Sequence, residues 1–145
     1  MNRPTLTSLV LSAALLFALL ACGKKGAPFL PQKTFGAKVA DLSVDQKESS
    51  VLLSGNVVFA DDRSSGVTGS RVYFAQYPSE SPPCDGCPIE YQGYRAFGPD
   101  VVQDERFFCR IPDIRRNQVY FFRATLMGPG GVEGPSSDPI QVTVE

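Results

Sequence analysis

The sequence contains no histidine and no tryptophan among its 145 residues. The absence of histidine excludes His-based catalytic triads, histidine general bases and histidine metal ligands. It also excludes attachment of a c-type haem through Cys-x-x-Cys-His. The 14 basic and 15 acidic residues nearly cancel, so the chain lacks the excess of positive charge that marks a dedicated nucleic-acid-binding protein. We therefore expect no nucleic-acid partner and no cofactor.

Turn-forming residues are abundant instead. The chain has 12 prolines and 13 glycines, and 43% of its residues are hydrophobic. This composition is typical of a loop-rich β domain rather than of a helical one.

The N-terminus has the pattern of an export signal. One positive charge, Arg3, precedes an apolar run over 9–20, which is shorter than the ~20 residues of a comfortable membrane span. The run ends in Leu-Leu-Ala followed by Cys22. This stretch resembles the lipobox of bacterial lipoproteins, which implies removal of residues 1–21 and acylation of Cys22. The alternatives are a plain signal peptide with a chance cysteine and a single-pass anchor.

Acylation would decide where the protein resides. One acyl chain gives marginal membrane binding, whereas two or more anchor a protein stably at ~0.8 kcal/mol per buried CH₂. Gly23 rather than aspartate follows the cysteine, which resembles the signal for export to the outer membrane in enteric-type bacteria. We expect a lipid-anchored protein of the bacterial cell envelope, on the outer membrane and facing the periplasm.

Residues 22–38 are expected to form a flexible basic tether. After Cys22 this segment holds four lysines and no acidic residue. Residues 39–145, in contrast, hold nine basic and fifteen acidic residues and therefore have a net charge of −6. Its start, Cys-Gly-Lys-Lys-Gly, is similar to short outer-membrane lipoproteins that begin Cys-Gly-x-Lys-Gly-Pro. One such family assists maturation of the lipopolysaccharide translocon, so the resemblance implies an alternative role as an assembly accessory.

From residue 39 onward, short apolar alternations are separated by Gly, Pro, Asp and Ser clusters. This pattern predicts an all-β, antiparallel β-sandwich of about seven strands with almost no helix. The expected strands are 39–44, 51–59, 71–77, 89–97, 106–111, 118–127 and 139–144, with a turn at 61–66.

The late part of this region carries a family resemblance. Residues 114–124, with Tyr120 and Phe122, occupy the place of Leu-x-Pro-Gly-x-x-Tyr-x-Phe-x-Val, and residues 131–136 resemble a Gly-x-Gly-x-x-Ser turn. Residues 39–145 thus resemble a fibronectin type III domain, an immunoglobulin-like fold. The resemblance implies that Tyr120 forms a tyrosine corner, with its hydroxyl bonded to upstream backbone. Gly55 stands where that family has a core tryptophan.

Three further cysteines, Cys84, Cys87 and Cys109, are candidates for a disulfide in an oxidising compartment. Cys84 and Cys87 can close a tight loop, or Cys109 can pair with one of them. A catalytic Cys-x-x-Cys normally opens a helix after a strand, whereas this one lies among prolines. A structural zinc site needs four nitrogen or sulfur ligands, but residues 39–145 offer only three thiols and no histidine. We therefore expect no metal site.

Two aromatic strands suggest a binding surface. If Val72, Phe74, Tyr120 and Phe122 face the core, then Tyr73, Tyr77, Val119 and Phe121 face outward, as does Ala75. These outward residues are the candidates for partner binding, and exposed apolar patches of this kind mark partner contacts. Cross-strand pairing on a solvent face and cover by a proline-rich insertion at residues 78–88 are the alternatives.

The expected function is therefore a non-catalytic one. A membrane-anchored lipoprotein would present its β-sandwich as a binding module for an envelope protein or a polysaccharide. An assembly accessory acting through the N-terminal segment is the alternative. A thiol–disulfide oxidoreductase using Cys84 and Cys87 is the least favoured hypothesis.

Overall fold

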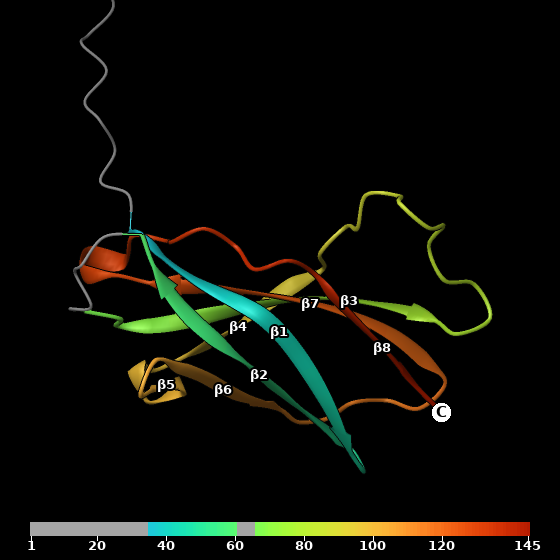
Figure 1. Ribbon diagram of the computed structural model, residues 1–145. Coiled ribbons are helices and arrows are strands. Elements are labelled where there is room, and N and C mark those ends of the chain that lie inside the picture. Colours follow the sequence, from blue (N-terminus) through green and yellow to red (C-terminus); the bar gives the residue numbers. More distant parts are fainter. Residues whose placement is uncertain (1–34, 61–65) are drawn as a thin grey trace, which may run out of the picture. The chain divides into compact units, whose positions relative to one another are not determined.

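The computed structural model describes residues 35–60 and 66–145, which form two antiparallel β-sheets (Figure 1). The predicted signal peptide, Cys22, most of the tether and most of the predicted 61–66 turn lie outside the described residues. The strands are β1 Ala37–Lys47, β2 Ser50–Phe59, β3 Gly69–Pro78, β4 Gly93–Phe97, β5 Val102–Gln103, β6 Arg106–Ile111, β7 Gln118–Met127 and β8 Ile140–Val144.

The described part has helical turns only at η1, Pro99–Val101, and η2, Pro129–Gly131. The expectation of an all-β antiparallel sandwich with almost no helix is thus confirmed. None of the helical segments in these residues has the length and apolarity needed to cross a membrane.

Each sheet has four strands, in the orders β1-β2-β6-β5 and β4-β3-β7-β8. The central pair of the second sheet, β3 and β7, joins segments some fifty residues apart, with Tyr73 opposite Arg123 and Tyr77 opposite Val119. This register decides which side chains meet on the outer face of that sheet.

The predicted strands 106–111 and 118–127 coincide with β6 and β7. The other five predicted strands differ from the observed ones at one or both ends. The first begins at Ala37, so Ala37 and Lys38 belong to a strand rather than to the tether. The fourth begins at Gly93, and an eighth strand, β5, pairs with β6. Asp104 and Glu105 connect β5 to β6 with positive φ angles of 49° and 60°, the backbone of a two-residue type I′ hairpin turn.

The core lies between the sheets, where the inward-facing residues of both are buried. Its largest fully buried side chains include Phe107, Phe122, Leu53 and Leu126. Gly55 pairs with Phe107 across β2 and β6. A Cβ at Gly55 would lie 2.7 Å from Cγ1 of Val39. Gly55 therefore has no room for the tryptophan side chain that fibronectin type III domains have at this position.

Tyr120 forms the predicted upstream contact. Its ring is buried, and its hydroxyl accepts a hydrogen bond of 2.9 Å from the backbone N–H of Arg115. The prediction of a tyrosine corner is confirmed. This bond ties the chain before β7 to the start of that strand.

Removal of this hydroxyl should therefore cost stability. We expect Tyr120→Phe to lower the free energy of unfolding by about 1 kcal/mol, the scale of one hydrogen bond, as measured by urea denaturation. Tyr94→Phe is the matched control, because the Tyr94 side chain is exposed. Equal stability of wild type and Tyr120→Phe would show that the bond has no energetic role.

Candidate functional site

The four partner-binding candidates lie on the outer face of the second sheet. Tyr73 and Tyr77 are on β3, and Val119 and Phe121 are on β7, where they alternate with the buried Tyr120. The rings of Tyr77 and Phe121 meet edge to face, with centroids 6.0 Å apart. The structure therefore brings all four predicted residues onto one face of the sheet.

That surface is not an open apolar patch, which corrects the prediction of its exposure. Val119 is only 3% exposed, and Ala75, also expected to face outward, is fully buried. Tyr73, Tyr77 and Phe121 are half-buried. The hydroxyl of Tyr77 lies 3.5 Å from the carbonyl oxygen of Glu90, which is in the loop between β3 and β4, after the predicted insertion. The proline-rich insertion itself lies beside Phe121, because Pro83, Cys84 and Cys87 line one groove with it.

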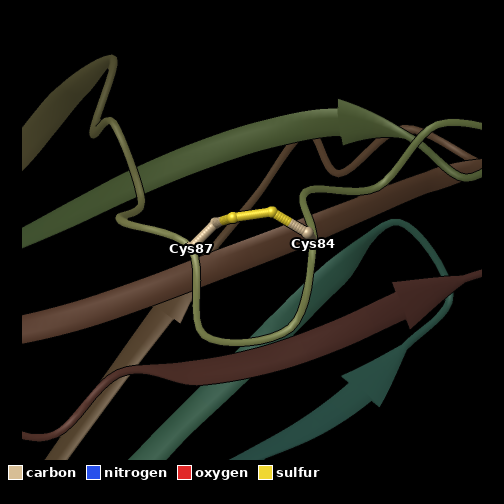
Figure 2. The surroundings of a disulfide bond; sticks show 2 residues. All are labelled: Cys84 and Cys87. Atoms are coloured by element: carbon tan, nitrogen blue, oxygen red, sulfur yellow. A yellow bond between two sulfur atoms is a disulfide. The ribbon is translucent and has the colours of Figure 1, made fainter.

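The insertion is organised around a disulfide between Cys84 and Cys87 (Figure 2). Their Cα atoms are 5.3 Å apart, and the Cys87 N–H donates a 3.0 Å hydrogen bond to the Cys84 carbonyl. Gly86 supplies a φ of 78°, which a residue without a side chain adopts at little cost. The bridge thus closes a tight turn within a loop between two strands.

The disulfide turn lies against β7 and the start of β8. Together they line a groove of about 280 Å³, whose walls include Cys84, Cys87, Ile89, Phe121 and Pro139. Phe121 is thus a wall of this groove rather than part of an exposed patch.

The exposed part of the outer face lies beside β4. We call Arg71, Tyr73, Tyr91, Tyr94, Arg123 and Glu133 the tyrosine–arginine cluster. The Arg71 guanidinium carbon lies 4.8 Å from the ring centroid of Tyr94, and that of Arg123 lies 4.8 Å from the centroid of Tyr91. The Tyr73 centroid is 5.6 Å from that of Tyr94 and 6.3 Å from that of Tyr91. Cations and rings thus alternate across three segments.

Charge is distributed unevenly within the cluster. Arg71 forms an ion pair and hydrogen bond with Glu133, and the Tyr73 hydroxyl also lies 3.3 Å from a Glu133 carboxylate oxygen. Burial raises the pKa of Tyr91, and the nearby charge of Arg123 partly offsets that effect. Arg123 has no ion pair with any acidic residue of the described part.

Five members of this cluster were not among the predicted site residues: Arg71, Tyr91, Tyr94, Arg123 and Glu133. Strand register would have identified Tyr94 and Arg123, because both pair with Tyr73, but no local sequence pattern encodes the register between distant strands. Tyr91 could not be found in this way, because it precedes β4 and reaches the cluster from the loop.

Cys109 lies apart from this face. It is 3% exposed on β6, has no disulfide partner, and burial raises its pKa to about 12, against a smaller opposite effect of Arg95. A thiol with so high a pKa is almost entirely protonated at neutral pH and is therefore a poor nucleophile. Within residues 35–60 and 66–145, no three acidic or cysteine side chains gather as metal ligands would.

Comparisons with known proteins agree with the fold but identify no family. No protein-family description matches the sequence, and no curated protein is significantly similar to it. The third fibronectin type III domain of the human KIAA0343 protein superposes with a TM-score of 0.55 at 17% identity, covering 86% of this chain and 92% of that one.

Two other solved structures are less similar. A myokine structure gives a TM-score of 0.48 at 11% identity, over 74% of this chain and 95% of that one. The chicken CNTN1 FN1–FN3 domains give 0.46 at 16% identity, over 74% of this chain and 32% of theirs. The two four-stranded antiparallel sheets and the similarity to the KIAA0343 domain show that the described residues have the fold of a fibronectin type III-like sandwich.

Proposed function

We propose that this protein is a lipid-anchored lipoprotein of the bacterial cell envelope, whose β-sandwich is a non-catalytic binding module for a protein or polysaccharide partner. The anchor is inferred from the apolar run that ends in Leu-Leu-Ala before Cys22. The location on the periplasmic side of the outer membrane is inferred from Gly23. The fibronectin type III-like fold supports the binding role.

The tyrosine–arginine cluster is the observation that carries the binding role. Tyrosine and arginine are the side chains most enriched, with tryptophan, at the energetic centres of protein interfaces. Tyr94 is 51% exposed beside Tyr73 and Arg71. An anchored domain also has a raised effective concentration toward partners in the same membrane layer, so modest contacts suffice for function.

The placement of the cysteines disfavours the oxidoreductase hypothesis. Cys84 and Cys87 are joined in a loop between β3 and β4, whereas a redox Cys-x-x-Cys opens a helix whose N-terminus stabilises the thiolate. The third thiol, Cys109, is buried. We therefore assign the disulfide a structural role.

Metabolic labelling tests the anchor. Cells fed an alkyne-tagged fatty acid should incorporate the label into the wild-type protein, and Cys22→Ala should lose all label and remain uncleaved in the inner membrane. Cys109→Ala is the control and should keep the label. A wild-type protein without label, or a Cys22→Ala protein that is still labelled or is cleaved correctly, would contradict the lipoprotein proposal.

A role in outer-membrane assembly through the N-terminal segment is the alternative, favoured by Cys-Gly-Lys-Lys-Gly at residues 22–26. Comparison of the full chain with a version ending at residue 38 separates the two roles. Complementation of an outer-membrane permeability defect by the short version would support the assembly role. Complementation by the full chain alone supports the binding module.

A further inference from the structure

Arg123 differs from Arg71 in the tyrosine–arginine cluster because its charge lacks an acidic partner. The ion pairs of the described residues are Lys38–Asp138 and Arg71–Glu133. The Arg123 guanidinium instead lies near two rings, with its carbon 4.8 Å from the Tyr91 centroid and 6.0 Å from that of Tyr73. Its Nε atom is buried and has no hydrogen-bond acceptor.

The surroundings of the Arg123 guanidinium favour binding of an anion. Partial burial strengthens its attraction to a carboxylate, because fewer water molecules screen the charge. The neighbouring rings restrict the side chain before binding, so less conformational entropy is lost when a ligand arrives. A carboxylate can also bind the two terminal nitrogen atoms of the guanidinium through two parallel hydrogen bonds, because Nε is its only nitrogen that is both buried and without an acceptor.

We propose that the tyrosine–arginine cluster docks an acidic segment of a partner protein, with an Asp or Glu carboxylate of that segment bound by the guanidinium of Arg123. The inference rests on the proposed function and narrows its partner from a protein or polysaccharide to a protein. Arg71 plays a different part, because its ion pair with Glu133 holds it in place over Tyr94.

Ring geometry favours a protein over a sugar chain. A sugar stacks best on a flat and open aromatic face, but the ring of Tyr73 is tilted by 53° against that of Tyr94 and by 75° against that of Tyr91. One face of Tyr94 is already covered by Arg71. The cluster therefore lacks a planar platform, whereas mixed tyrosine and arginine surfaces suit irregular protein segments.

The charge of the domain disfavours a polyanionic glycan more than it disfavours a short acidic protein segment. Residues 39–145 carry a net charge of −6, which repels a long polyanionic glycan at distances up to the Debye length. A protein segment with one or two carboxylates experiences far less repulsion, and it can still place one of them against Arg123.

Selection from a random dodecapeptide library on the purified full-length chain tests the inference. Selected peptides should be enriched in Asp and Glu, and Arg123→Gln should weaken their binding at least tenfold. Arg106→Gln is the matched control, because Arg106 also lies over a ring, 5.5 Å from the centroid of Phe108 on the other sheet. This control should bind the peptides like wild type.

A second variant guards against a change in folding. Tyr94→Ala removes an exposed ring and should also weaken peptide binding while the thermal midpoint stays near that of wild type. Peptides without acidic enrichment, or equal binding by Arg123→Gln and Arg106→Gln, would overturn the inference. So would Arg123-dependent binding of oligoglucuronate with no such binding of peptides. These outcomes leave the lipid label on Cys22 untouched, so they are distinguishable from failure of the anchor.

Discussion

Replacement of Phe107 by alanine is expected to lower the free energy of unfolding by about 3–5 kcal/mol. Phe107 is fully buried and is among the largest such side chains in the described part. Its partner on β2 is Gly55, which has no side chain to fill the space that the ring vacates. The cost combines lost burial of apolar surface with the cavity that remains.

The neighbouring residue provides a stringent control. Phe108 is on the same strand but is 41% exposed on the opposite face, and Phe108→Ala should change the stability by less than about 1 kcal/mol. Urea denaturation followed by tyrosine fluorescence measures both variants. Similar losses in the two would mean that β6 is shifted by one residue, because such a shift exchanges the inner and outer faces.

The second large effect is a loss of stability at alkaline pH through Cys109. Burial raises its pKa from an ordinary value of 9.0 to about 12. Between these values the unfolded chain loses the thiol proton while the folded chain keeps it. Stability from this group is therefore complete below pH 9 and falls as the pH rises toward 12. The loss between pH 7 and pH 10 should be about 1.4 kcal/mol, and it should continue by about 1.4 kcal/mol per further unit.

Cys109→Ala isolates this contribution, because the tyrosines and lysines titrate in both proteins. The variant should be less stable at neutral pH, owing to its smaller side chain, yet its stability should decline less steeply above pH 9. Urea midpoints measured from pH 7 to pH 10.5 give both curves. Parallel curves would show that the thiol ionises in the folded state as easily as in the unfolded chain.

The sequence predicted β6 and β7 at their observed bounds because their apolar residues alternate along most of each strand, with polar residues or clear turns at the ends. It failed for β5, which has only two residues and depends on the turn at Asp104 and Glu105. It also failed at the start of β4, because Ile89 and Tyr91 belong to the loop between β3 and β4. The alternation of apolar and polar residues does not distinguish a loop residue that packs on a sheet from a strand residue.

The candidate site was predicted only in part. Alternation correctly assigned Val119 to the face opposite the buried Tyr120, but that face is covered at Val119. Period-two patterns determine the side of a sheet that a residue occupies and contain no information on what covers that side. Arg71 and Arg123 were missed because a charged residue on an outer face is ordinary until its neighbours are known.

The amino-acid sequence by itself determined the β class, the division of charge between tether and domain, and most strand positions, because these depend on local composition and on the pairing of apolar residues with one face. Only the tertiary structure showed that Tyr91 from a loop, Tyr94 from β4 and Arg123 from β7 share one surface. It also showed that Cys84, rather than Cys109, forms the disulfide with Cys87. Those contacts arise from strand register and loop packing between distant segments, which no local pattern encodes.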